Sequence, residues 1–474
     1  MLAPRLRVLE VHLFERPVRL RMPFRFGVVT LTEAPQVFVA ARIRLADGRE
    51  GWGAAAELLA PKWFDKNLAL TNEQNFDQLR TALRLARDAY RSESTPRTAF
   101  GHLAAHYRVI LSAGDALRLN PLVGSFGPAE LDRAIADALC RILGVSFYDA
   151  VRHNLLGINL ALTPDLRGFD LTQFLSDLEP NDTVEARHTV GLVDAIRGHP
   201  HQVNDGLPES LEEVVATYGH CWFKLKVTGN VDADIERLKE IAAVLDATRR
   251  PYRVSIDGNE QYDALESLLM LWRRMQREPT LGRLYASTAF IEQPISRRHA
   301  LGRDVSVLSA LKPVIIDESD ADLDTFPAAK RLGYLGVSSK CCKGFYKSLL
   351  NAARCQRWSE HGERYFMTGE DLTTQAGLAV QQDLALASLL GLEHVERNGH
   401  HYVNGMADLP EDEQRAFLGA HPDLYERSHG AVRVAIRAGR LAIGSLRTPG
   451  FASGVLPDFS AMQPSPEPDL RAGR

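Results

Sequence analysis

Two lysines lie two residues apart in the apolar stretch "WFKLKV", residues 222–227. In a β-strand, side chains at positions i and i+2 share a face roughly 6–7 Å apart, so Lys224 and Lys226 would present their ammonium groups at one place. Two like charges this close disfavour each other, which lowers the pKa of at least one of them. A lysine with a lowered pKa can accept a proton as a general base. The pattern therefore predicts proton-transfer chemistry.

Acidic residues end the apolar runs that follow. Asp257 ends "VSID", Glu292 ends "AFIE" and Asp317 ends "VIID". A single acid in such a place is usually a helix cap or a solvated loop residue. Three that converge would be costly to bury unless a cation neutralised them. Oxygen ligands without His or Cys favour a hard ion, so the set predicts a Mg²⁺ site.

A Mg²⁺ ion beside the lysine pair would polarise a substrate carboxylate and make the adjacent C–H bond acidic. One lysine would take the proton, while the other stays charged and stabilises negative charge on a substrate oxygen. We therefore expect an enzyme that removes the proton α to the carboxylate of a small-molecule substrate, giving a metal-stabilised enolate.

Eight short apolar runs recur between residues 188 and 398, with helix-patterned segments between them. They are "HTVGLVD", "WFKLKV", "YRVSIDGN", "TAFIEQP", "KPVIIDES", "LGVSSK", "YFMTGED" and "LEHVERN". Such an alternation predicts an α/β protein with a TIM-type barrel of seven or eight β/α units, whose active site lies at the carboxyl ends of the strands. A doubly wound open sheet is the alternative, but no Gly-rich phosphate loop follows an early strand.

The flanking segments do not fit this repeat. Residues 1–60 alternate as strands with a hairpin signal at Asp47-Gly48, and residues 64–156 are patterned as helices. Residues 157–186 are expected to be a loop or linker. The last residues, "QPSPEPDLRAGR", are Pro-rich and charged and are expected to be disordered.

Bulk composition excludes several classes of function. The net charge of −4 and the pI near 6.4 leave no basic field for nucleic acid. No stretch approaches the roughly 20 apolar residues of a membrane span, and the first residues lack the pattern of a secretory signal. The five cysteines show neither disulfide nor zinc spacing. We expect a cytoplasmic, reduced protein, which could associate as a homo-oligomer although no motif specifies a symmetry.

Together these motifs resemble the enolase superfamily, in its muconate lactonising enzyme-like (mandelate racemase/muconate lactonising enzyme) branch. "FKLKV", "SIDGN", "FIEQP" and "IIDES" match the K-x-K, D-x-N, second-ligand and third-ligand motifs of its barrel. The resemblance implies an α+β N-terminal capping domain over residues 1–157 and a barrel domain over residues 187–405. A C-terminal segment, residues 406–474, would return to the cap.

The resemblance also implies roles for individual residues. It makes Asp257, Glu292 and Asp317 the Mg²⁺ ligands. Lys226 becomes the base on one face of the substrate, and Lys224 assists it.

Other residues would support or contact the substrate. Asn259 and Glu318 would lie behind the metal ligands. The loop "MPFRFGVVT", with Phe24 and Arg25, would close over the substrate. Glu370, at the end of the seventh strand, could touch the substrate or cap a helix.

Two adjacent residues, Ser339 and Lys340, are candidates for the position of the second base. The branch usually has a lysine on the sixth strand, five residues before a glycine, but counting back from Gly344 reaches Ser339. Lys340 would face the site only if the register slipped by one, because adjacent strand residues point to opposite sides. We therefore expect one-face chemistry, dehydration or cycloisomerisation, rather than racemisation or epimerisation with Lys340 as second base.

Two other classes of function stay open. A non-catalytic member could retain metal binding without turnover, since Ala54 and Thr373 stand where the branch commonly has Glu. A Schiff-base aldolase could use one of the paired lysines, but it would not need three carboxylates. His400 and His401 are expected to be solvated and to have no role in the mechanism.

Overall fold

A closed sheet of eight parallel strands forms the centre of the fold in a computed structural model that describes residues 2–198, 203–360 and 362–468. Neighbouring strands pair in chain order, and the last pairs with the first, which closes the barrel. The predicted TIM-type barrel is therefore confirmed. The strands are β4 (Thr183–Val190), β5 (Trp222–Lys226), β6 (Arg253–Asp257), β7 (Thr288–Glu292), β8 (Val314–Ile316), β9 (Gly336–Ser339), β10 (Phe366–Gly369) and β11 (His394–Arg397).

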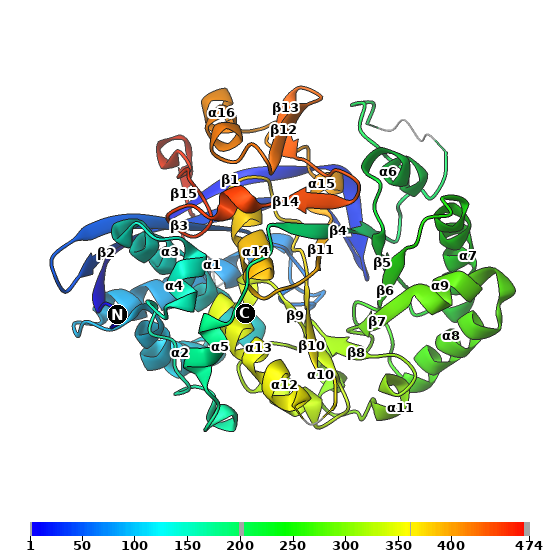
Figure 1. Cartoon of the computed structure of the whole chain (residues 1–474), viewed down its shortest axis with the longest axis horizontal. Coiled ribbons are helices and arrows are strands. Elements are labelled where there is room, and N and C mark those ends of the chain that lie inside the picture. Colours follow the sequence, from blue (N-terminus) through cyan, green and yellow to red (C-terminus); the bar gives the residue numbers. More distant parts are fainter. Residues whose placement is uncertain (1, 199–202, 361, 469–474) are drawn as a thin grey trace.

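Helices follow most of these strands and cover the outside of the barrel (Figure 1). In β5 the side chains alternate: Phe223 and Leu225 pack in the apolar layer with residues of the helices, whereas Lys224 points to carboxylates of other strands inside the barrel. The helices are α6 (Leu211–Tyr218), α7 (Val231–Ala247), α8 (Leu265–Arg277), α9 (Gly282–Ser287), α10 (Arg297–Ala300), α11 (Ser306–Ser309), α12 (Thr325–Lys330), α13 (Phe345–Ser359), α14 (Leu378–Leu389) and α15 (Gly399–Tyr402).

The N-terminal part is an antiparallel sheet packed on helices, which lies beside the barrel (Figure 1). Its strands β1 (Leu6–Phe26) and β2 (Val29–Leu45) form a long hairpin that turns at Gly27, where φ is +53°, and β3 (Glu50–Leu58) pairs with β2. The helices are α1 (Asn72–Ser92), α2 (Ala99–Ala116), α3 (Pro121–Leu143) and α4 (Phe147–Arg152). This is the arrangement expected of a capping domain.

One expectation about the flanking segments needs correction. The stretch 157–186 is not only a loop, because it contains α5 (Leu171–Ser176) and the start of β4. This strand start was not predictable, because its residues, Thr183 to Ala186, mix polar and apolar types.

The C-terminal segment divides between barrel and cap. After α16 (Glu411–Ala420), the hairpin of β12 (Tyr425–Ser428) and β13 (Ala431–Val434) leads to β14 (Arg440–Ala442), which pairs antiparallel with β4 of the barrel. Only β15 (Gln463–Pro464) pairs with β1 of the cap. Of the predicted disordered tail, residues 469–474 lie outside the described residues.

Two further observations concern the chain as a whole. Within the described ranges, none of the helices combines the length and apolar character needed to cross a membrane. All five cysteines carry free thiols, and Cys341 and Cys342 are buried directly after β9.

Helix α3 approaches its neighbours at glycines that leave no room for a side chain. A Cβ atom at Gly127 would lie 2.0 Å from the carbonyl oxygen of Ala82 in α1, and one at Gly53 would lie 2.1 Å from the backbone nitrogen of Ala138. Contacts this short cannot exist without moving backbone.

We therefore expect Gly127→Ala to lower the free energy of unfolding by about 1–3 kcal/mol, the usual cost of overpacking. Urea unfolding measures the difference. Gly282→Ala in α9 is the matched control, because a Cβ there meets nothing within 4 Å. Equal losses in the two variants, or none in Gly127→Ala, would show that the helices separate freely.

Candidate active site at the barrel mouth

Lys224 lies at the centre of a ring of carboxylates inside the barrel. Its Nζ atom is 2.8 Å from Glu292 Oε1, 2.8 Å from Glu370 Oε2, and 3.0 Å from both Glu396 Oε2 and Asp257 Oδ2. The Lys224 side chain is 1% exposed. Five different strands thus contribute one charge each to a single buried cluster.

This cluster reverses the expected effect on Lys224. Burial by itself would lower the pKa of Lys224, but the four carboxylates outweigh burial and raise that pKa well above its usual value. The expectation that the lysine pair lowers a pKa therefore does not hold for Lys224. The sequence could not reveal this, because Glu370 and Glu396 reach Lys224 only through closure of the barrel.

Lys226 and Lys340 approach the mouth from opposite sides. Lys226 lies on β5, the second barrel strand, and Lys340 directly follows β9, the sixth, so three strands lie between them in either direction. Lys226 Nζ is 2.6 Å from Asp257 Oδ2, and Lys340 Nζ is 2.5 Å from Asp317 Oδ2. Both lysines line the same cavity.

Counting back five residues from Gly344 indicates Ser339 as the residue that faces the site. The structure places Lys340 there instead. Ser339 Oγ donates to Ser348 Oγ of α13 at 2.9 Å, outside the barrel wall. Ser338 donates to Asp317, and Lys340 continues in extended conformation with φ −140° and ψ 138°. Since i and i+2 share a face, Ser338 and Lys340 both point inward. Lys340 is therefore placed where a second base would lie, contrary to expectation.

Three acids end adjacent strands of the mouth, and their surroundings fit a hard metal ion. Asp257, Glu292 and Asp317 belong to β6, β7 and the residue after β8. Glu292 Oε2 is buried and has no hydrogen-bond partner in the described part of the chain, and the same holds for Glu318 Oε2 and Asn259 Oδ1. Buried oxygen acceptors without donors are costly, and they are the ligand type that Mg²⁺ prefers. The donor set therefore fits Mg²⁺.

The predicted residues behind these acids also come together. Asn259 Nδ2 donates to Glu318 Oε1 at 3.0 Å, and the Asn259 backbone N–H donates to Asp257 Oδ1 at 2.8 Å. Burial raises the pKa of Glu318, and the ammonium group of Lys66 opposes this rise.

The pKa values of two of the acids proposed to bind the metal are shifted in opposite directions. Burial raises the pKa of Glu292, and the neighbouring carboxylates of Asp257 and Glu370 add to this rise. Burial would also raise the pKa of Asp317, but Lys340 and Lys343 outweigh it and hold that pKa well below its usual value.

The cap closes the mouth with apolar side chains. Phe24, Phe26 and Trp63 line a cavity of about 30 Å³, which Lys226 and Lys340 line from the barrel. The Trp63 ring centroid is 4.4 Å from Lys340 Nζ, a cation–π distance. A volume of this size holds water but no organic acid, so a substrate enters only if the cap hairpin moves away.

Two residues expected at the substrate lie elsewhere. Arg25 is exposed, because Phe24 and Phe26 occupy the inward positions of the hairpin and alternation turns Arg25 outward. Glu370 lies in the barrel interior, where Lys224, Arg187 and Thr368 hold its carboxylate. Neither side chain lines the cavity.

Sequence reasoning missed several residues of the site. Glu396 ends the eighth run as the other acids end theirs, so the same strand-end pattern could have found it. Lys343 contacts Asp317 at 3.2 Å, and Trp63 comes from the cap. No local signal marks these last two residues.

The fold and the site define a class of protein: a parallel barrel whose strand ends present lysines and carboxylates beneath an α+β cap. Residues 206–413 match the model of a family described as enolase C-terminal domain-like. No curated protein sequence matches the chain.

Solved structures resemble nearly the whole chain. Muconate lactonizing enzyme from Pseudomonas fluorescens, complexed with muconolactone, is 18% identical with a TM-score of 0.59, over 96% of this chain and 97% of that one. A mandelate racemase/muconate lactonizing protein from Herpetosiphon aurantiacus is 16% identical with a TM-score of 0.60, over 94% and 98%. Dipeptide epimerase from Methylococcus capsulatus, complexed with Mg and a dipeptide, is 19% identical with a TM-score of 0.54, over 92% and 99%. The barrel part of the chain, residues 206–413, therefore matches the enolase C-terminal domain-like family, and the chain as a whole has the fold of these solved structures.

Replacing the central lysine tests the buried cluster. In chelator-treated protein we expect Lys224→Met to lower the free energy of unfolding at pH 7 by about 3–5 kcal/mol, because it leaves four buried carboxylates without their shared cation. Urea unfolding measures the loss, and Lys239→Met on the exposed face of α7 is the control.

The loss in free energy of unfolding caused by Lys224→Met should become smaller as the pH falls. Burial would raise the pKa of Glu396, but Lys224 and the other lysines hold it well below 4.5. A depressed carboxyl pKa contributes stability that is present above pH 4.5 and is lost as the pH falls through the folded-state value. A loss that is constant or larger toward low pH would contradict this account of Lys224.

Proposed function

We propose that the protein is an isomerase that removes the proton α to a substrate carboxylate and returns a proton to the opposite face of the enolate. One observation carries this proposal: Lys226 and Lys340 face one cavity from opposite strands of the barrel. Racemisation or epimerisation needs an acid or base on each face of a planar enolate. The structural resemblance to dipeptide epimerases is consistent with this reaction.

A neighbouring carboxylate holds Lys340 in its charged form. Burial would lower the pKa of Lys340, but the carboxylate of Asp317 outweighs it and raises that pKa. Lys340 is therefore protonated near neutral pH and is suited to deliver a proton. Lys226 accepts the proton from the other face.

Asp257, Glu292 and Asp317 would hold a Mg²⁺ ion, whose positive charge would make the α-proton more acidic. Lys224 does not enter the proton transfer. Its charge is shared among the acids of the cluster, so it orients Glu292 and Glu370 toward the barrel axis. The cap residues exclude water from the reacting atoms.

A second reaction is supported by the resemblance to muconate lactonizing enzyme and to 2-chloromuconate cycloisomerase. In a dehydration or cycloisomerisation Lys226 alone would suffice, and Lys340 would stabilise charge instead of moving a proton. The cytoplasmic location and homo-oligomeric assembly stay predictions.

Metal removal provides the first test. At 100 times its Kd, Mg²⁺ should raise the free energy of unfolding by roughly 2.7 kcal/mol, since it binds only the folded chain. Thermal unfolding with Mg²⁺ and with chelator measures the shift. Glu292→Gln and Asp317→Asn should remove most of it, whereas Asp304→Asn in an exposed turn should leave it intact. A wild-type protein indifferent to Mg²⁺ would contradict the metal assignment.

Stereochemistry provides the second test. Carboxylic acids are first screened for deuterium uptake at the α-carbon, and each enantiomer of an accepted acid is then incubated in D₂O. The wild type should invert both enantiomers. Lys226→Ala should slow exchange of one enantiomer and Lys340→Ala that of the other, each by about 10²–10⁴-fold.

Lys312→Ala is the control, because Lys312 Nζ donates to Thr288 O at the start of β7, the far end of the barrel. Labelling with retained configuration, and no inversion in the wild type, would reject the two-base reaction in favour of dehydration or cycloisomerisation.

A further inference from the structure

A cluster of histidines lies outside the barrel wall, on the face of β4 that turns away from the active site. Arg187 and Thr189 of β4 point inward, where Arg187 pairs with Glu370 and Thr189 Oγ1 donates to Glu396 Oε1 at 2.6 Å. His188 between them therefore points outward. His400 had been expected to be solvated, but it packs against His188.

Three imidazole rings form a nearly equilateral triangle. The ring centroids of His188, His220 and His400 are 5.3 Å apart in each of the three pairs. One ligand nitrogen from each ring lies within 4.8 Å of the others. The three residues come from β4, from the residues just before β5, and from α15.

The nitrogens of this triangle are buried without hydrogen bonds. Nδ1 of His188, Nε2 of His220 and both ring nitrogens of His400 have no partner among the described residues. His188 is 1% exposed and His220 4%. Burying an unpaired polar nitrogen is costly, so the cluster has a binding capacity that the fold itself does not use.

His220 shows which nitrogen is free to bind. Its Nδ1 lies 2.8 Å from the carbonyl oxygen of Ala186, which can only accept, so Nδ1 carries the proton. Nε2 then carries the lone pair that can bind a metal ion. A histidine ligand whose second nitrogen donates to a backbone carbonyl is the usual arrangement around bound metals.

All three rings are in the form that binds metals. Burial lowers the pKa of His220 to about 4 and holds the pKa values of His188 and His400 well below the usual range. Neutral imidazole is the ligand species, so no proton has to be displaced near pH 7.

We propose that His188, His220 and His400 bind one Zn²⁺ ion, at a site separate from the carboxylates of the barrel mouth. Tetrahedral Zn²⁺ with Zn–N distances of 2.0–2.1 Å places imidazole centroids about 5.2 Å apart. The centroids already have this spacing, and ring rotation brings the nitrogens together.

The neighbouring charges select the type of ion. Arg433 and Arg397, which pairs with Asp371 at 3.1 Å, line a small cavity together with His400, and no carboxylate is among its described lining residues. A hard ion such as Mg²⁺, which depends on carboxylate charge, is disfavoured there. Zn²⁺ bonds strongly to neutral imidazole and tolerates such surroundings better.

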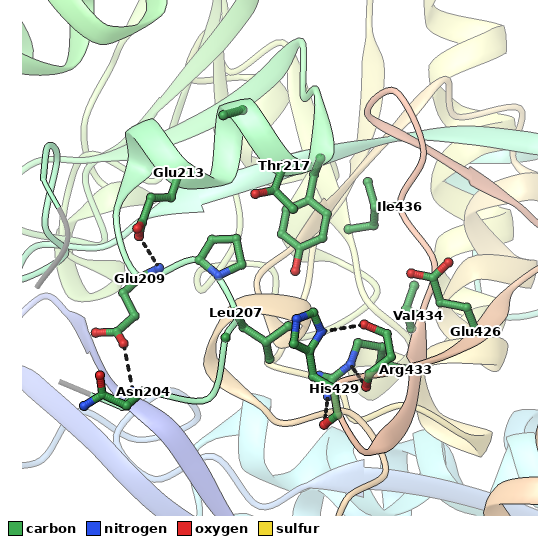
Figure 2. Close-up of a pocket in the computed structure, with 15 residues that line it drawn as sticks. Asn204, Leu207, Glu209, Glu213, Thr217, Glu426, His429, Arg433, Val434 and Ile436 are labelled. Atoms are coloured by element: carbon green, nitrogen blue, oxygen red, sulfur yellow. Dashed lines mark hydrogen bonds between the residues drawn. The ribbon is translucent and has the colours of Figure 1, made fainter. Parts of the chain in front are cut away.

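A larger cavity provides a route for the ion. Tyr218, Arg433 and Val434 line both the small cavity and a larger one of about 590 Å³. Figure 2 shows the larger cavity, with Thr217 of α6 on one wall and Arg433 and Val434 of β13 on the other. The Tyr218 ring lies 5.3 Å from that of His400 and separates the cavity from the triangle. A movement of the Tyr218 ring would open a path from the larger cavity to the triangle.

Metal titration of the full chain tests the proposal. Protein freed of metal by chelation is saturated with Mg²⁺, and Zn²⁺ binding is then measured by equilibrium dialysis. We expect one tightly bound Zn²⁺ per chain, and with Co²⁺ the strong visible absorption of a four-coordinate site. His188→Asn and His220→Asn should weaken binding by about 100-fold or more.

Two controls separate this site from the rest of the molecule. Asp317→Asn should keep the four-coordinate Co²⁺ spectrum, because Asp317 belongs to the barrel mouth. His421→Asn should also keep it, since His421 is a buried histidine whose nitrogens contact Ser445 and Gly454 instead.

His400→Gln gives a third ligand variant at a less buried position, in case the other two do not fold. The proposal is overturned if wild-type protein with Mg²⁺ binds no Zn²⁺, if its Co²⁺ spectrum is only that of a six-coordinate carboxylate site, or if folded ligand variants bind Zn²⁺ as well as the wild type does.

Discussion

The charge of Lys224, shared by four buried carboxylates, is the interaction on which the barrel interior depends. Asp257, Glu292, Glu370 and Glu396 come from four strands, and none of them could be buried as an anion without a cation in contact. The lysine therefore connects strands on both sides of the barrel closure. It also sets the direction in which Glu292, a proposed metal ligand, presents its oxygens.

Ion pairs between lysines and carboxylates also occur at the mouth of the barrel. Lys226 pairs with Asp257, and Lys340 pairs with Asp317, so each lysine proposed to move a proton is held by an acid proposed to bind metal. Binding of Mg²⁺ would compete with the lysines for these carboxylates. In the proposed mechanism, metal binding would therefore be coupled to release of the lysines toward a substrate.

The cap contributes by exclusion of water. Phe24 and Phe26 from the β1–β2 hairpin and Trp63 from the loop after β3 cover the lysines. Without this cover the ion pairs would be solvated, and their electrostatic effect on a substrate would be much weaker. The hairpin turns at Gly27, at the tip nearest the barrel, where movement would open the mouth.

Much of the fold and part of the site could be predicted from the sequence. The barrel strands were predictable because strands covered by helices are continuous apolar runs, and the acids stood out because each ends such a run. The K-x-K pair was predictable because alternation along one strand is a local property. Together these local patterns determined the class of protein.

The tertiary structure decided what depends on distant residues. Whether Ser339 or Lys340 faces the site follows from the register of β9 against its neighbours, which a count along the chain does not contain. The pKa of Lys224 depends on Glu370 and Glu396, which closure of β11 onto β4 brings to it. The triangle of His188, His220 and His400 joins residues far apart in the sequence, so no spacing rule could find it: the sequence determined which side chains are available, and packing determined which of them meet.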